Sequence, residues 1–206
     1  MKEVEFPHLP YTDVESLLNH PPGQGVAYII RHAERTPLTE PETIFSADLT
    51  EKGWEDARHF GRRLGEVYKI SAVFCSPVER CLHTASAILE GAGLSLHSQA
   101  RWWLFSPFLK AQDRHHSHAI SINSTTVPER GVESLDRNSL RTVIERIKIP
   151  PVPGLINLYI THDSTVTPLL GMLLGLDTVW VSQYPQYLEG FVLTRDGTGN
   201  PILFMP

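Results

Sequence analysis

Three short runs of almost continuous apolar residues divide the chain, at 26–30, 72–75 and 155–161. Runs of this length without alternation are typical of strands buried on both faces of a sheet. Around them, apolar residues recur at helical spacing, which predicts helices from about 50 to 68, from 77 to 90, from 134 to 147 and from 163 to 173. Strands that alternate with helices predict a mostly parallel sheet covered on both faces, a three-layer α/β/α sandwich.

Two further patterns complete the expected fold. Thr12-Asp13-Val14-Glu15 fits a capping box and predicts a short helix through Leu17 and Leu18. Near the other end, segments 189–194 and 202–204 flank Asp196-Gly197-Thr198-Gly199-Asn200, which predicts an antiparallel hairpin at one edge of the sheet. Residues 97–133 show no clear periodicity. We therefore expect one domain over 1–206, with 97–133 as a small variable cap or loop region.

Composition narrows the class of protein. The chain has 206 residues, 20% of them charged, and a formal net charge of -5. These values exclude a disordered acidic chain and argue against a nucleic-acid partner that needs a basic surface. Two cysteines do not make a disulfide framework, the start MKEVEFPHLP has no signal-peptide pattern, and no apolar run is long enough to span a bilayer. We expect a cytoplasmic protein with no membrane partner, and the sequence leaves its oligomeric state open.

Polar residues follow directly after each of the three apolar strands. The segments are 31–37, 76–80 and 161–165, and ligands of open α/β sheets bind beyond the carboxyl ends of the strands. We therefore expect the three segments to converge on one crevice. The candidate site residues in them are Arg31, His32, Arg35, Arg80, His162 and Asp163.

The chemistry of these residue types points to a phosphate group. Guanidinium groups are planar, permanently charged forks that match phosphate oxygens. The two histidines supply a nucleophile and a second phosphate donor, and the carboxyl can protonate a leaving oxygen. Nearby arginines disfavour a protonated imidazole, and a neutral imidazole is what a nucleophile requires.

The runs RHAERTP, LTEKGWEDARHFGRRL, CSPVERCLHTASAIL and THDSTVTPLLGML resemble the histidine phosphatase superfamily, in that order. The resemblance implies a phosphoglycerate mutase-like fold, no cofactor and no metal. It makes His32 the nucleophile and Asp163 the proton donor, and it assigns the phosphate pocket to Arg31, Arg35, Arg80 and His162. The pair His162-Asp163, with Thr165 two positions later, is similar to the acid phosphatase branch, as is Arg35-Thr36-Pro37.

A sibling branch offers another source of the proton, and the sequence departs from the family pattern in three places. The mutase branch takes its acid from a Glu in the variable region, so Glu129 and Glu133 stay alternative proton donors. Ala33 replaces the usual Gly, which is tolerated unless the backbone there needs a positive φ. His83 stands where the family often has Gln, and we assign it no role. The short cap argues against a substrate as large as phytate.

Several residues have a structural interpretation beside the functional one. Asp163 and Thr165 could cap the helix that follows them. His115, His116 and His118 with Asp113 have no regular ligand spacing, so a solvated loop is favoured over a metal site, although one of these residues or Arg114 could contact substrate.

Several aromatic residues and Cys75 also have both a structural and a functional interpretation. Trp102, Trp103, Phe105 and Phe108 are most simply core or cap packing, with a wall for an apolar substrate group as the alternative. Trp180, Tyr184 and Tyr187 form either an exposed patch or edge packing. Cys75 and Arg80 are separated by four residues, one fewer than the cysteine phosphatase loop has, so Cys75 is interpreted as a buried structural thiol.

The leading functional hypothesis is a metal-independent phosphomonoester hydrolase with a phosphohistidine intermediate. Its substrate is a phosphorylated small molecule or protein. The alternatives are a phosphomutase of the same superfamily and a non-catalytic phosphate-binding interaction module.

Overall fold

The chain builds a single sheet with helices packed against both of its faces. The computed structural model describes residues 8–19, 23–37, 46–104, 137–176 and 183–206. In chain order the elements are α1 (Val14–Asn19), β1 (Val26–Arg31), α3 (Glu51–Val67), β2 (Lys69–Cys75), α4 (Glu79–Gly91), β3 (Gln99–Ala100), the 3-10 helix η1 (Trp102–Leu104), α5 (Arg137–Arg146), β4 (Leu155–Thr161), α6 (Asp163–Leu173), β5 (Gly190–Arg195) and β6 (Pro201–Phe204).

The six strands lie in the order β3-β2-β4-β1-β5-β6. The three predicted apolar runs are the neighbours β2, β4 and β1, and they pair in parallel. The two edge pairings that follow, β1 with β5 and β5 with β6, are antiparallel. Asp196 closes the predicted hairpin, since its carboxylate accepts the backbone N–H groups of Thr198 and Asn200. The predicted α/β sandwich with an antiparallel edge hairpin is confirmed.

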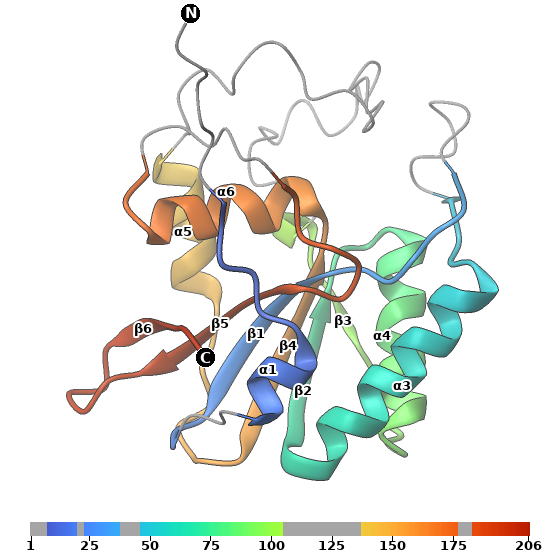
Figure 1. The fold of residues 1–206 in the computed structure, drawn as a ribbon, viewed down its shortest axis with the longest axis horizontal. Coiled ribbons are helices and arrows are strands. Elements are labelled where there is room, and N and C mark those ends of the chain that lie inside the picture. The colour runs from blue at the N-terminus through green and yellow to red at the C-terminus, as the bar shows by residue number, and fades with distance from the viewer. Residues whose placement is uncertain (1–7, 20–22, 38–45, 105–136, 177–182) are drawn as a thin grey trace, which may run out of the picture.

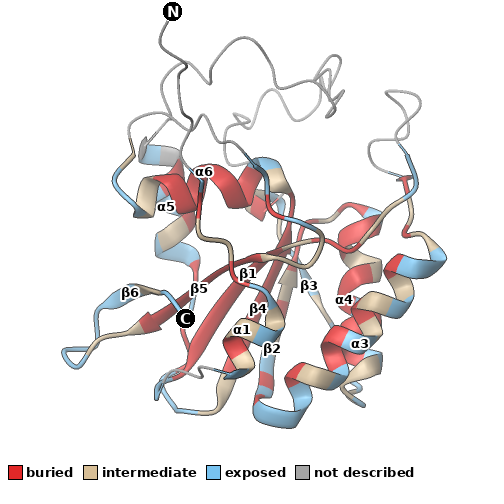
Figure 2. Cartoon of the chain, viewed as in Figure 1, coloured by how far each residue is buried: buried red, intermediate tan, exposed pale blue. Residues whose placement is uncertain are grey.

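Successive residues of each central strand face opposite layers of the sandwich. In β1, Tyr28 and Ile30 join the core beneath α1, α3 and α4, whereas Ala27 and Ile29 join the core beneath α5 and α6. Figure 1 shows these two groups of helices on opposite faces of the sheet. In Figure 2 the central strands are buried along most of their length, whereas the outward faces of the helices are exposed. Burial on both faces explains why β1 and β4 are apolar without alternation.

Element boundaries differ from the predicted ones at three places. Helix α1 is capped by Asp13, which accepts the N–H of Ser16 at 2.7 Å, whereas Thr12 forms a β-bridge with Gly190; the predicted capping box is therefore wrong. Helix α4 begins at Glu79, two residues after the predicted Pro77, with Val78 as its N-cap. Strand β2 begins at Lys69, three residues before the predicted start.

The described part of the variable region contains two short elements. Residues 99–104 form the short strand β3 and the helix η1, neither of which the sequence predicted. Trp103 packs against Tyr159 with ring centroids 6.0 Å apart, as the core interpretation expects, whereas Trp102 is exposed and is not part of the core. Phe105, Phe108 and the rest of the predicted cap lie outside the described residues. Within the described part of the chain, no helix combines the length and apolar character needed to cross a membrane.

Candidate active site

The three polar segments leave neighbouring strands at the same edge of the sheet. The N–H of His32 donates to the carbonyl of Thr161 at 2.9 Å, just beyond the ends of β1 and β4. The N–H of Ser76 likewise donates to the carbonyl of Ile160 at 2.9 Å, just beyond the end of β2. The predicted convergence at the carboxyl ends of these strands is thus present.

His32 is buried, and its hydrogen bonds define its tautomer. The Nδ1 atom lies 2.7 Å from the carbonyl oxygen of Ala33, which can only accept, so Nδ1 carries the proton. The lone pair of Nε2 is therefore available, and it accepts a hydrogen bond from Nε of Arg80 at 3.1 Å. Burial lowers the pKa of His32 well below its usual value, and the electrostatic interactions with His162 and Arg80 lower it further. His32 is therefore a neutral imidazole, and its unprotonated nitrogen, Nε2, faces the guanidinium group of Arg80.

His162 is the second buried imidazole of the site, with its ring centroid 5.4 Å from that of His32. Nη2 of Arg80 donates to its Nδ1 at 3.2 Å, so its Nε2 carries the proton and donates to Oγ of Ser76 at 3.0 Å. Burial, followed by the charge of Arg80, lowers the pKa of His162 well below its usual value. Arg80, itself buried, thus connects the two histidines.

Arg31 and Asp163 form an ion pair at the more open side of the cluster. Nη2 of Arg31 lies 2.9 Å from Oδ2 of Asp163, with side-chain exposures of 14% and 27%. Asp163 is the first residue of α6, and His162 occupies the N-cap position. Asp163 is therefore not the N-cap that the structural alternative predicted. Its Oδ1 accepts the N–H of Ser164 at 2.7 Å, which leaves Oδ2 directed at Arg31.

Arg35 lies on the loop that follows β1 and is less tightly held than the other arginines. Its backbone bridges Leu49, and its Nη1 donates to the carbonyl of Thr36 at 2.9 Å. Burial lowers the pKa of its guanidinium, and the charges of Arg31 and Asp163 also act on it. All six predicted site residues are therefore brought together at one edge of the sheet.

Two contacts fix the backbone around His32. The hydroxyl of Thr84 accepts the N–H of Ala33 at 3.0 Å and donates to the carbonyl of Arg80 at 2.6 Å. On the other side, Gly53 of α3 packs so closely that an added Cβ would lie 2.1 Å from the carbonyl oxygen of Glu34. Ala33 does not have a positive φ, so the alanine in place of the family glycine causes no backbone strain.

Sequence reasoning missed three contributors to the site: Thr84, Pro185 and Tyr187. Thr84 lies one helical turn after Arg80, and that spacing was a usable signal. The carbonyl of Pro185 accepts from Nη1 of Arg31 at 2.8 Å, and the ring of Tyr187 lies 4.3 Å from Cζ of Arg31. Tyr187 is thus neither a free patch nor simple edge packing.

The other residues that the sequence analysis singled out have contacts of their own or lie outside the described residues. His83 binds Asp48, with Nδ1 and Oδ1 2.5 Å apart, and its ring lies against Trp54. Residues 105–136, which include Glu129, Glu133, Asp113, Arg114 and the histidines at 115–118, are not described, nor is Trp180.

Both cysteines are buried, and burial raises the pKa of each thiol. Cys81 lies against the site, with Sγ 3.8 Å from Nε2 of His162. A buried thiol of raised pKa is a poor nucleophile, in agreement with the structural interpretation of Cys75.

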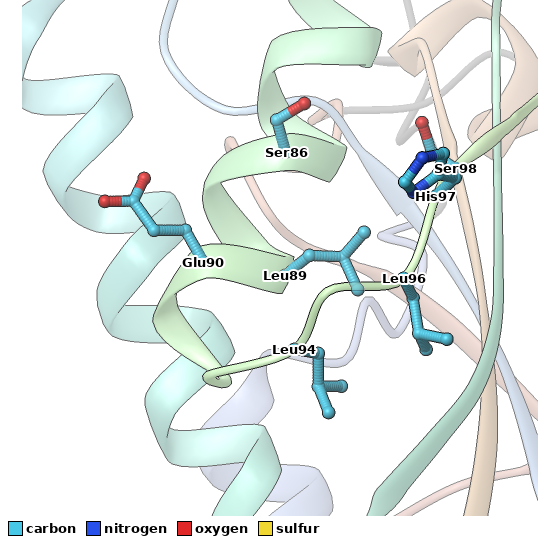
Figure 3. A pocket seen from close by; sticks show the side chains of 7 residues that line it. All are labelled: Ser86, Leu89, Glu90, Leu94, Leu96, His97 and Ser98. Atoms are coloured by element: carbon cyan, nitrogen blue, oxygen red, sulfur yellow. The ribbon is translucent and has the colours of Figure 1, made fainter.

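Two surface hollows lie away from the cluster. One, of about 520 Å³, lies between the C-terminal half of α4 and the segment that follows it, and its lining includes Leu89 and Glu90 of the helix and Leu94, Leu96 and His97 of the segment (Figure 3). The other, of about 420 Å³, is lined by Glu51, Trp54, Glu55 and Arg58. None of the six predicted site residues lines either hollow.

Comparison with known proteins agrees with the motifs. Residues 27–103 match the family model described as histidine phosphatase superfamily, branch 1. No curated protein sequence gives a significant match. The superfamily resemblance is thereby confirmed over the matched residues, whereas the likeness to acid phosphatases remains a prediction.

Solved structures share the fold. A mycobacterial glucosyl-3-phosphoglycerate phosphatase is similar with a TM-score of 0.56 and 15% identity, covering 88% of this chain and 98% of that one. An ecdysone phosphate phosphatase from Bombix mori, solved with tungstate, has a TM-score of 0.51 and 15% identity, covering 88% and 92%. A phosphoglycerate mutase from Plasmodium falciparum has a TM-score of 0.51 and 14% identity, covering 89% and 90%. The phosphoglycerate mutase-like fold is shown.

Proposed function

We propose that this protein hydrolyses phosphomonoesters through a covalent phosphohistidine at His32. The observation that carries the proposal is the state of His32: a buried, neutral imidazole with Nδ1–H fixed on the carbonyl of Ala33 and the Nε2 lone pair facing Arg80. A nucleophile needs that lone pair, and a transferred phosphoryl group needs cations around its oxygens. The two phosphatases of the same fold support a hydrolase, and the mutase of that fold supports phosphoryl transfer in general.

The first transfer forms a bond between Nε2 of His32 and phosphorus while the bond to the leaving oxygen breaks. For the attack, Arg80 must exchange its hydrogen bond to Nε2 for one to a phosphoryl oxygen. Arg31 and Arg35 hold the remaining oxygens in this proposal. His162 joins them by changing tautomer once Arg80 has turned to the phosphoryl group, so that Nδ1 instead of Nε2 carries the proton and donates to an oxygen. Positioning with charge stabilisation supplies most of the catalysis.

Asp163 is the proton donor of the proposal. Its protonated carboxyl gives a proton to the leaving alkoxide, which departs as an alcohol. In the second transfer water attacks phosphorus, its proton goes to the Asp163 carboxylate, and the bond to His32 breaks, so that inorganic phosphate leaves and both residues are restored. Phosphate bound by Arg31 competes with the ion pair between Arg31 and Asp163, which frees the carboxyl for this role.

The substrate of the proposal is a phosphorylated small molecule or a phosphorylated protein. Because Arg31 and Asp163 remain partly exposed, the leaving-group side of the cluster is reachable from solvent. The reaction as written uses only side chains of the chain and water, so we expect no requirement for a metal or cofactor.

The test is hydrolysis of p-nitrophenyl phosphate in the presence of EDTA, from acidic to neutral pH. Wild type, H32A and a matched control, H97A, are compared, since His97 lies at the hollow beside α4 and away from the cluster. We expect turnover in wild type and H97A and none in H32A. Equal turnover in H32A and wild type would refute the assignment of His32. Tungstate binding by a wild-type protein that shows no turnover would favour the non-catalytic module instead.

A further inference from the structure

A tight turn precedes β5 and contains an unusual backbone conformation. The N–H of Glu189 donates to the carbonyl of Gln186 at 3.2 Å, and the Glu189 carboxylate accepts the N–H of Gln186 at 2.7 Å. Leu188, inside this turn, has a φ of 64° and is the only non-glycine residue with a positive φ in the described part of the chain. Left-handed backbone is unfavourable for a leucine, so the turn is strained, and strain of this kind concentrates at functional sites.

The turn is attached to the end of β1 at Arg31. The N–H of Arg31 donates to the carbonyl of Glu189 at 2.9 Å, and the N–H of Leu188 donates to the carbonyl of Arg31 at 3.2 Å. The side chain of Arg31 contacts the same segment again, through the carbonyl of Pro185. The position of the turn is therefore determined by the residue that begins the first site segment.

Tyr187, beside the strained residue, places its ring against two site residues at once. The ring centroid lies 4.3 Å from Cζ of Arg31 and 5.8 Å from the ring centroid of His32. A guanidinium over an aromatic face is held by the ring quadrupole in addition to van der Waals contact. The ring is only partly buried, so filling the core does not account for its position.

The hydrogen bonds of Arg31 show why such a contact matters. Nη1 donates to Pro185 and Nη2 pairs with Asp163, whereas Nε is buried and has no partner among the described residues. These bonds lie in the plane of the guanidinium, and the bond to Asp163 must be given up when a phosphoryl oxygen takes its place. Cζ of Arg31 lies over the Tyr187 ring, so this contact is separate from the hydrogen bonds of Nη1 and Nη2 and does not take the place of phosphate.

We propose that Tyr187 is a positioning residue of the phosphate pocket: its ring, set by the strained turn, holds the Arg31 guanidinium in the orientation that binds the phosphoryl group. The inference rests on the proposed function for its catalytic consequence. Its effect on anion affinity does not require turnover.

The experiment compares Y187F, which keeps the ring, with Y187L, which keeps apolar bulk without a π-face. Tungstate affinity is measured by calorimetry, kcat/KM with p-nitrophenyl phosphate, and stability by thermal unfolding. We expect Y187F to match wild type within about twofold and Y187L to lose about 10-fold in tungstate affinity and in kcat/KM. The melting temperatures of the two variants should agree. If Y187L does not fold, Y187M serves the same comparison.

A double-mutant cycle tests whether the effect passes through Arg31. In an R31M background, which has no cation at this position, Y187L should cost at most about twofold in tungstate affinity. An undiminished loss in that background, or wild-type affinity in Y187L, would overturn the proposal. Tungstate affinity that depends on Tyr187 in a protein without turnover would refute the proposed hydrolase and leave this inference standing.

Discussion

The hydroxyl of Thr84 links the backbone of the loop that carries His32 to the backbone of the helix that carries Arg80. It accepts the N–H of Ala33 and donates to the carbonyl of Arg80, and the side chain is fully buried. The variant T84V keeps the shape of the side chain and removes only the hydroxyl. It leaves the buried N–H of Ala33 without a partner, and it also leaves the loop of His32 less firmly held.

The expected loss of stability in T84V follows from the backbone N–H of Ala33, which is left without an acceptor. An unsatisfied buried N–H costs about 1–3 kcal/mol. A chain of this length loses roughly 2–4 °C of melting temperature per kcal/mol, so T84V should melt about 4–8 °C lower for a loss of about 2 kcal/mol. T84S keeps the hydroxyl and loses one buried methyl group, which costs about 0.8 kcal/mol.

Urea unfolding and thermal unfolding measure these free energies for wild type, T84S and T84V, and p-nitrophenyl phosphate hydrolysis follows the site. We expect T84V to be the least stable of the three by about 1 kcal/mol and to lose activity that T84S retains. Stability of T84V equal to or above that of T84S would show that the hydrogen bond to Ala33 does not hold the loop.

Three further predictions concern the same region. The pKa values of His32 and His162 are lowered in the folded protein, so below about pH 6.5 the unfolded chain binds more protons than the folded one. The free energy of unfolding should therefore fall with decreasing pH, by up to about 1.4 kcal/mol per pH unit for each histidine. H162N should reduce this slope in urea titrations, and an unchanged slope would contradict the prediction. G53A should displace the backbone at Glu34 and destabilise the fold by about 1–3 kcal/mol, with weaker tungstate binding by calorimetry; unchanged affinity would show that the loop absorbs the clash. Leu188 has a left-handed backbone, which glycine adopts without strain, so L188G should be at least as stable as L188A in thermal unfolding. Inside a helix or strand the order is the reverse, since glycine there costs about 0.5–1 kcal/mol relative to alanine. A more stable L188A would argue against strain.

The central sheet was predictable because its strands are buried on both faces, which leaves an uninterrupted apolar signal in β1 and β4. The first residues of the helices were less predictable from the sequence. Pro77 is compatible with a first helical position, but α4 begins at Glu79, and Asp13 rather than Thr12 caps α1. Capping depends on which neighbouring side chain reaches the free N–H, and Thr12 is engaged by Gly190, far away in sequence.

The placement of the six candidate site residues at one edge of the sheet was predictable because each lies in a polar segment that follows an apolar strand, whereas their roles remain predictions. Tyr187 was not, because its role depends on a turn with a left-handed leucine, a residue type that gives no sequence signal for that conformation. The tautomers of His32 and His162 were also beyond the sequence, since they follow from which acceptor each ring nitrogen meets.

The central claim is that the phosphoryl group passes through His32. Wild type and H32N are mixed with p-nitrophenyl phosphate, quenched rapidly under alkaline conditions and analysed by peptide mass. We predict one phosphoryl group on the peptide that contains His32, stable to alkali and labile to acid, formed as fast as turnover and absent from H32N. Turnover without a phosphorylated enzyme, or a phosphoryl group on a different residue, would contradict the account.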